Sequence, residues 1–365
     1  MTFAISSVET FVVSIPNRQG PTGLELGGQS WSSVETLLVR LVGDDGTVGW
    51  GEGFGFHVSR VTKQALDRLV APLLLGRALD GPSAWTDQAR RKLHNFGMNG
   101  PVVFAISAVD IALWDIAAKR AGKPLHELIG ARRTRIPAYA SLMRHADPAE
   151  LRRTVVTAIA EGYGQIKLHE ARVEQLFAVR AMLDAGQALM TDVNCPWTPE
   201  EAVAIAGELE GAGLAWLEEP TWPPNDFEGL ARVRRAGATP IAAGENLSGL
   251  GDFKGLLAAG AVDIAQPSVT KVGGVTELLR VAALCTEHGV RLAPHSPYFG
   301  PGFVATAHIL ACAAEPIPAE WYYGDMEADL YGFRFKPQAG EIALPDAPGL
   351  GADPDMAVVE RYQVA

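Results

Sequence analysis

Residues 188–194 (ALMTDVN), 214–220 (LAWLEEP) and 240–246 (PIAAGEN) each hold a short apolar run that ends in a carboxylate. Residues 290–296 (VRLAPHS) and 317–322 (IPAEWY) repeat the pattern with a histidine and a glutamate. A repeat of about 25 residues fits one strand, one helix and two short loops. In a (β/α) barrel the residues that follow the strands meet at one mouth, where such barrels hold their active sites. The pattern therefore predicts a (β/α) barrel and an active site at the mouth formed by the carboxyl ends of its strands.

The regular alternation of strand and helix begins at Ile136. Short loops between the two periodicities favour parallel α/β units, and an eight-stranded α/β barrel is expected. We expect strands at 136–141, 164–168, 188–192, 214–217, 240–244, 262–266, 290–294 and 317–320. The alternative is an open doubly wound sheet, but the Gly-x-Gly-x-x-Gly of a dinucleotide fold does not follow the first strand.

The first part of the chain has a different pattern. Residues 4–15 and 34–43 alternate apolar with polar, which predicts an antiparallel meander, and helical periodicity follows from about 59 to 123. We expect an α+β capping domain over residues 1–125 and a barrel over 126–330. The turn-rich tail, about 331–365, is expected to return to the capping domain.

Bulk composition excludes several classes of function. The chain has 365 residues, 48% of them hydrophobic and 20% charged, with a net charge of −11. An acidic chain without a basic cluster is not expected to bind nucleic acid. The start MTFAISSVETFVV lacks the basic and apolar regions of a secretory signal, and no membrane association is expected. The cysteines lack metal-ligand spacing, so we expect them reduced in a cytoplasmic protein.

Asp192, Glu218 and Glu245 follow three successive predicted strands, 26 and 27 residues apart. Carboxylates that meet at one mouth repel one another, and a hard divalent cation with oxygen ligands relieves the repulsion. Mg²⁺ is the ion that this set favours. The alternative interpretation is that each acidic residue caps the helix that follows it.

The chain resembles the enolase superfamily, of the mandelate racemase and muconate lactonizing enzyme type, and its mandelate racemase-like subgroup. The matching pieces run in order from residue 104 to the C-terminus: SAVDIALWDIAAK, GYGQIKLH, TDVN, WLEEP, GEN, KVGGVTE, APH and PDAPGLG. The resemblance implies a modified barrel, of (β/α)7β type, with an N-terminal capping domain. It also implies Mg²⁺ held by the same three carboxylates, and a commonly oligomeric protein, so a homo-oligomer is expected.

Within WLEEP the resemblance selects Glu218 over Glu219 as the metal ligand. Strand alternation is expected to turn one of the two away. Glu219 is expected to lie behind the metal ligands or to contact the substrate, as are Ser268 and Lys271. Asn194 and Asn246 are expected to orient the metal ligands, as donors behind them.

Lys167 and His169 stand two residues apart in QIKLHE, so both are expected to face the barrel interior. The family usually has Lys-x-Lys here and commonly uses the second lysine as the base. His169 takes that place, and a neutral imidazole is a competent base near neutrality. Lys167 would then pair with the substrate carboxylate, although the two roles could be exchanged.

His295 is expected on the opposite face of the substrate. The family pairs this histidine with an aspartate after the sixth strand, where this chain has Ser268. A hydroxyl fixes the tautomer only weakly and does not raise basicity, so His295 is expected to be a better acid than base. Muconate-lactonizing relatives carry a catalytic lysine at that position, which disfavours that branch. Lys271 is expected to be a structural cation behind the site.

Glu320 resembles the family's carboxyl donor to the substrate carboxylate, a role that requires a raised pKa. Its alternative role is a helix cap. The loops near 17–31 and 52–58 could close over the substrate. Their candidate residues, none with an assigned role, are Arg18, Trp31, Phe54, Phe56 and His57.

Together these features predict a Mg²⁺-dependent lyase that acts on a small carboxylate. The leading expectation is dehydration of a hydroxylated acid, such as a sugar acid, to a 2-keto-3-deoxy acid. The alternatives are a racemase or epimerase of a 2-hydroxy acid, a lactone cycloisomerase, and a relic that binds metal and acid without turnover.

Overall fold

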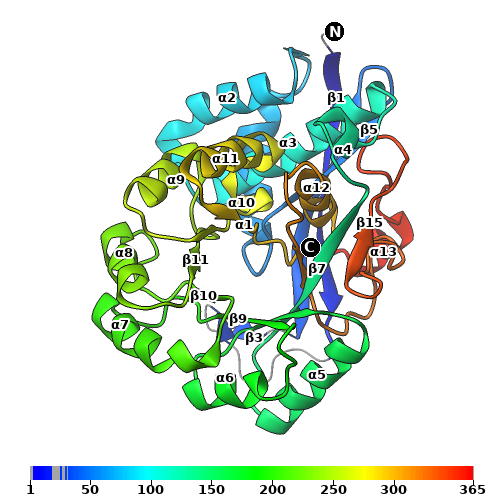
Figure 1. Ribbon diagram of the computed structural model, residues 1–365. Coiled ribbons are helices and arrows are strands. Elements are labelled where there is room, and N and C mark those ends of the chain that lie inside the picture. The colour runs from blue at the N-terminus through cyan, green and yellow to red at the C-terminus, as the bar shows by residue number, and fades with distance from the viewer. Residues whose placement is uncertain (1–2, 19–24, 27–28, 31, 365) are drawn as a thin grey trace.

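The structure is a computed structural model that describes residues 3–18, 25–26, 29–30 and 32–364. It consists of an antiparallel sheet with helices, followed by a curled parallel sheet surrounded by helices (Figure 1). The expected α/β barrel with an α+β capping domain is confirmed. Trp31 lies outside the described residues.

The capping domain is built on a four-stranded sheet in the order β5-β4-β1-β6. Its strands are β1 (Phe3–Pro16), β4 (Ser33–Gly43), β5 (Val48–Gly53) and β6 (Ala78–Leu79), and β2 (Glu25–Leu26) pairs with β3 (Gln29–Ser30). Its helices are α1 (Ser59–Ala65), η1 (Leu66–Val70), η2 (Ala71–Leu73), α2 (Pro82–Leu93), η3 (His94–Phe96), α3 (Pro101–Arg120) and α4 (Leu125–Leu128).

Helix α3 packs closely against the capping sheet because β5 carries glycines at the contact. A Cβ on Gly51 would lie 1.9 Å from the carbonyl oxygen of Ala108, and one on Gly49 would lie 2.4 Å from that of Ala112. This helix is long and apolar enough to cross a membrane, but 83% of its most apolar stretch is buried. That burial is what a core helix between two domains requires.

The barrel sheet has the order β13-β12-β11-β10-β9-β8-β7-β14, with every neighbouring pair parallel. Its strands are β7 (Arg135–Leu142), β8 (Gln165–Leu168), β9 (Ala188–Asp192), β10 (Trp216–Glu218), β11 (Ile241–Ala243), β12 (Ile264–Ala265), β13 (Arg291–Leu292) and β14 (Ala319–Tyr322). All eight predicted strands are present. Ser296 links β13 to β14, since its Oγ and backbone N–H bond Glu320.

Helices follow one another around this sheet (Figure 1). They are α5 (Pro148–Ala160), α6 (Val173–Arg180), α7 (Pro199–Glu208), η4 (Glu210–Ala212), α8 (Phe227–Ala236), α9 (Gly249–Ala258), α10 (Val269–Val272), α11 (Gly274–His288) and α12 (Pro301–Leu310). Their starts carry sequence signals: Thr198 and Glu201 form a capping box on α7, and Asp147 and Asp226 cap α5 and α8.

The last segment holds β15 (Glu341–Ala343) and α13 (Met356–Tyr362). Strand β15 pairs antiparallel with β7 of the barrel, and Val359 of α13 is buried with Val13 and Trp50 of the capping sheet. The segment therefore contacts both domains.

The lower part of the barrel interior is apolar. Six side chains from alternating strand positions pack there: Tyr139, Met190, Trp216, Ala242, Ile264 and Ala293. This layer excludes water beneath the polar residues at the mouth, so charges there interact strongly.

Candidate active site

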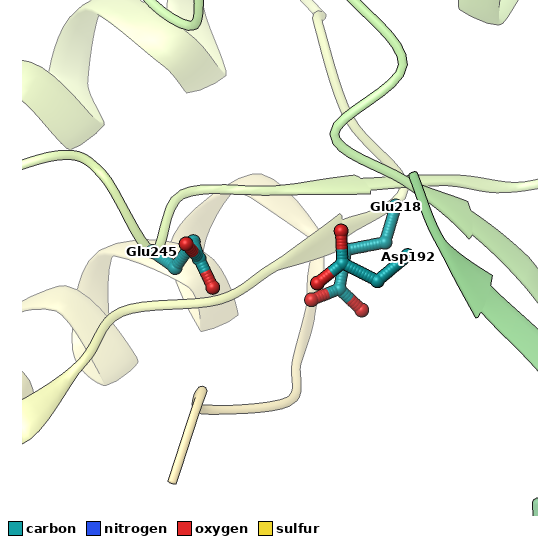
Figure 2. Close-up of side chains that lie close together, drawn as sticks. All are labelled: Asp192, Glu218 and Glu245. Atoms are coloured by element: carbon teal, nitrogen blue, oxygen red, sulfur yellow. The ribbon is translucent and has the colours of Figure 1, made fainter. Parts of the chain in front are cut away.

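Asp192, Glu218 and Glu245 come together at the carboxyl ends of β9, β10 and β11 (Figure 2). One oxygen from each lies within 4.8 Å of the others. Burial, and then the charge of Glu218, raise the pKa of Asp192 well above its ordinary value. The Oδ2 of Asp192 is buried without a hydrogen-bond partner among the described residues. Crowded carboxylates with a buried oxygen that lacks a hydrogen bond fit a hard divalent cation such as Mg²⁺.

Lys167 of β8 is fully buried among these carboxylates. Its Nζ lies 2.6 Å from Glu218, 2.9 Å from Glu320 and 3.4 Å from Asp192. Burial lowers the pKa of Lys167, but the charges of Glu218 and Glu320 outweigh burial and raise it well above its ordinary value. In the metal-free protein Lys167 is therefore a cation beside the site.

His169, just past β8, lines the cavity beside the triad. Its Nδ1 lies 2.8 Å from the carbonyl oxygen of Leu142, which can only accept, so Nδ1 carries the ring proton. The Nε2 then presents its lone pair and lies 3.5 Å from Oδ2 of Asp192. Burial, and then the charge of Lys167, lower the pKa of His169 from 6.5 to about 4. The ring is therefore neutral near neutral pH.

His295 stands at the other end of the triad, after β13. Its Nε2 lies 2.9 Å from Oε2 of Glu245 and donates to it. Its Nδ1 lies 3.0 Å from the hydroxyl of Tyr298 and 3.4 Å from that of Ser268. The structure thus places Ser268 beside His295 as expected, and it adds Tyr298. No strand periodicity marks Tyr298, because it lies in the loop before α12.

Glu320 of β14 is fully buried and accepts from Ser141 and from the backbone of Ser296. The expected raised pKa is wrong in this structure. Burial raises the pKa of Glu320, but the charge of Lys167 outweighs burial and lowers it. The sequence does not show that Lys167 reaches across the barrel from β8 to β14.

Glu219 does not turn away as strand alternation suggested, and it lies beside the site, where a residue behind the metal ligands or against the substrate was expected. Strand β10 ends at Glu218, and Glu219 has φ 47°, which sends its side chain into the same cavity. Burial, and then the charge of Glu245, raise the pKa of Glu219 to about 8.

Three polar residues hold these carboxylates in place. Asn246 donates from Nδ2 to Glu219 at 2.8 Å, and Lys271 donates to the Oδ1 of Asn246 at 3.0 Å. Lys271 is 4.0 Å from Glu245 and also lines the cavity, so it is not only a cation behind the site. Asn194 contacts Asp192 through its backbone N–H rather than its side chain.

A cavity of about 580 Å³ opens above these groups. Most of its polar lining comes from the barrel, and His57 and Asn99 of the capping domain add to it. Its apolar walls include Phe54, Phe56 and Phe104 of the capping domain with Met143 and Tyr322. Phe54, Phe56 and His57 line it as expected of a covering loop. Arg18 is not among the lining residues.

Known proteins share these domains and this arrangement. Residues 7–130 match the family described as mandelate racemase / muconate lactonizing enzyme, N-terminal domain. Residues 150–358 match the family described as enolase C-terminal domain-like. The chain belongs to the enolase superfamily, of the mandelate racemase and muconate lactonizing enzyme type.

Relatives within the superfamily cover nearly the whole chain. The chain is 34% identical to L-talarate/galactarate dehydratase of Salmonella typhimurium, over 88% of this chain and 80% of the relative. It is 32% identical to 3,6-anhydro-alpha-L-galactonate cycloisomerase of Streptomyces coelicolor, over 90% of this chain and 92% of the relative. A crystal structure of a racemase from Streptomyces coelicolor with bound magnesium superposes with a TM-score of 0.86 at 31% identity, over 99% of this chain and 100% of that one. These similarities support an enolase-superfamily enzyme.

Proposed function

We propose that this protein removes the proton α to a carboxylate and expels the oxygen on the neighbouring carbon. The proposed reaction is dehydration of a hydroxylated sugar acid to a 2-keto-3-deoxy acid. One observation carries the proposal: two imidazoles flank the acidic triad, with His169 beside Asp192 and His295 beside Glu245. Base and acid can then act on opposite sides of one bound acid.

Asp192, Glu218 and Glu245 would hold Mg²⁺, which supplies stabilisation of the negative charge that develops on the substrate carboxylate. Lys167 adds a fixed positive charge among the same carboxylates. The apolar layer beneath excludes water, so this charge is poorly screened. The site is thus organised for an anion.

His169 is the proposed base. Its Nδ1 proton is held by the carbonyl of Leu142, and its Nε2 is free to accept the α-proton. Lys167 is enclosed by Glu218, Glu320 and Asp192 and is not among the residues that line the cavity, whereas His169 is, which favours His169 over Lys167 for this role.

His295 is the proposed acid. The C–H bond at the α-carbon breaks first, and its electron pair moves onto the substrate carboxylate to give an enediolate. That pair then forms a double bond to the β-carbon as the β-oxygen leaves. In its imidazolium form His295 gives the Nε2 proton to that oxygen, which departs as water and leaves the ring neutral. The resulting enol takes a proton at the β-carbon, loses its hydroxyl proton and becomes the 2-keto-3-deoxy acid.

Cycloisomerisation is a second candidate, because the walls of the cavity on the capping-domain side are largely aromatic. The hydroxyl of Tyr322 bonds Asn17 at 2.6 Å, so Tyr322 offers mainly its ring to the cavity. Such walls suit an anhydro or lactone ring, which has fewer hydroxyls to satisfy than an open chain. In that reaction the ring oxygen leaves in place of water.

The test is proton NMR in D₂O with Mg²⁺ and a library of aldonic, aldaric, anhydro and lactone acids. We expect a 2-keto-3-deoxy acid or a ring-opened keto acid, depending on the substrate. The variant His169→Asn should lose both deuterium exchange and product. The variant His295→Asn should keep α-deuterium exchange and lose product. Exchange with inversion and no elimination would make the protein a racemase or epimerase, and no exchange with any acid would contradict the proposal.

A further inference from the structure

In the mandelate racemase-like family the histidine at this position pairs with an aspartate, which His295 lacks. Two hydroxyl groups contact its Nδ1 instead. We propose that Ser268 and Tyr298 together form a neutral positioning pair that replaces this carboxylate. The proposal rests on the proposed function of His295 as the acid.

The contacts form a closed triangle around the inner nitrogen of the ring. The hydroxyls of Ser268 and Tyr298 are hydrogen-bonded to each other, and both face Nδ1 of His295. The rings of Tyr298 and His295 meet edge to face, with their centroids 5.6 Å apart. Ser268 is fully buried and Tyr298 is 4% exposed, so water does not compete for these contacts.

The backbone brings the three residues together from two strand ends. Ser268 and His295 form an isolated parallel bridge that continues the pairing of β12 and β13. Tyr298 lies three residues beyond His295 and returns to the same point before α12 begins. Because the two hydroxyls contact Nδ1, the opposite nitrogen, Nε2, faces the cavity and contacts Glu245.

The chemistry of the pair predicts which step it serves. A carboxylate behind the ring would orient it and also stabilise its positive charge. Two hydroxyls orient the ring without adding a negative charge. Loss of the pair should therefore misplace the proton that His295 gives to the β-oxygen and leave abstraction by His169 almost unchanged.

The test compares Tyr298→Phe, Ser268→Ala and the double variant with the wild-type enzyme and Mg²⁺. The matched control is Tyr163→Phe, which removes the hydroxyl of another buried tyrosine, one with no hydrogen-bond partner among the described residues. Loss of an orienting partner typically costs about 10–100-fold. We expect Y298F to lower kcat for elimination by about that factor, with KM and α-deuterium exchange changed less than about threefold. The double variant should lose less than the product of the two single losses, because the residues act as a unit.

Two outcomes would overturn the proposal. One is an equal loss of exchange and elimination in Y298F, and the other is a Y298F enzyme that behaves like Y163F. Crystal structures of the double variant and of Y163F give a readout that does not depend on activity. The ring of His295 should leave its position in the double variant alone. An undisturbed ring there would refute the positioning role even if the proposed reaction were correct, whereas a displaced ring in an enzyme without any exchange would refute only the reaction.

Discussion

At the scale of single residues, Lys167 supplies the positive charge that offsets the repulsion between the carboxylates of the triad. It bridges carboxylates from β9, β10 and β14, all of them buried. Burying a carboxylate without a partner is costly, and removing one member of a buried ion pair typically costs about 3–5 kcal/mol. Lys167 and a divalent cation therefore serve partly the same purpose.

This argument predicts that Lys167→Met destabilises the metal-free protein by about 3–5 kcal/mol and that Mg²⁺ restores part of the loss. The measurement is chemical denaturation of the variant with EDTA and with excess Mg²⁺. The control is Lys254→Met, which removes an exposed lysine from α9. Equal destabilisation in EDTA and in Mg²⁺ would show that the cation does not enter this cluster.

The triad makes a second prediction about metal affinity. Glu245→Gln removes a charged oxygen ligand and should weaken binding of Mg²⁺ or Mn²⁺ by at least about tenfold. Titration calorimetry, or the electron paramagnetic resonance spectrum of free Mn²⁺, measures this affinity directly. Glu208→Gln on the exposed face of α7 is the matched control. Unchanged affinity in E245Q would remove Glu245 from the ligand set.

The spacing of the sequence predicted the neighbours of the triad well, because parallel strands place equivalent positions side by side. It could not predict contacts made by loops. Glu219 enters the cavity through a positive φ that alternation does not describe, and Tyr298 reaches His295 from a loop. Arg18 does not line the cavity, and Trp31, with most of the loop predicted near 17–31, lies outside the described residues.

At the scale of elements, Glu52 of β5 joins the capping domain to the start of α12. Its carboxylate accepts from the backbone N–H groups of Gly300 and Gly302, at 3.1 and 2.8 Å, and from Thr36. A buried carboxylate at a helix N-terminus satisfies donors that the helix leaves unpaired. Because the chain between His295 and α12 is short, Glu52 also restrains the loop that carries Tyr298.

Glu52→Gln should therefore destabilise the protein by about 1–3 kcal/mol, since the NH₂ group of the glutamine would face either the backbone N–H groups at the start of α12 or the hydroxyl of Thr36. The midpoint of urea denaturation is the measurement. Glu360→Gln on α13, an exposed site, is the control. A stability change in E52Q no larger than that in E360Q would mean that these bonds are not stabilising.

The sequence predicted the order of elements more accurately than their ends. The strands expected at 262–266 and 290–294 are Ile264–Ala265 and Arg291–Leu292 in the structure. Pairing beyond these short strands continues as the isolated bridge between Ser268 and His295, which lie in the site. The tail was expected to be turn-rich, and α13 was not predicted, because seven residues after Asp355 give little periodicity.

At the scale of the whole molecule, α3, α12 and the returning tail hold the two domains together. Asp115 of α3 accepts from the backbone N–H groups of Trp50 in the capping sheet and Leu350 in the tail. His308 of α12 also bonds the tail, with Nε2 at 3.2 Å from the carbonyl of Leu350. These contacts connect segments that are far apart in the sequence.

His308 can make its contacts only as a neutral ring. Its Nε2–H donates to Leu350, so its Nδ1 must accept from the backbone N–H of His126, at 3.1 Å, and from Nδ1 of His126, at 2.9 Å. Burial, the largest effect, lowers the pKa of His308 from 6.5 to about 3, and the nearby His126 lowers it further. The unfolded chain binds a proton as pH falls below about 6.5, whereas the folded chain does not until about 3.

Stability should therefore decrease as pH falls from about 7 to 5, and this one group accounts for about 2 kcal/mol of the loss. His308→Gln keeps an acceptor for His126 and a donor for Leu350 but cannot titrate, so its denaturation midpoint should change less over this range. Exposed His288→Gln should follow the wild-type curve. The variant H308Q has no imidazole on α12 that could bind a proton at this contact. If H308Q and the wild type lose the same stability between these two pH values, the acid sensitivity must therefore arise from other groups.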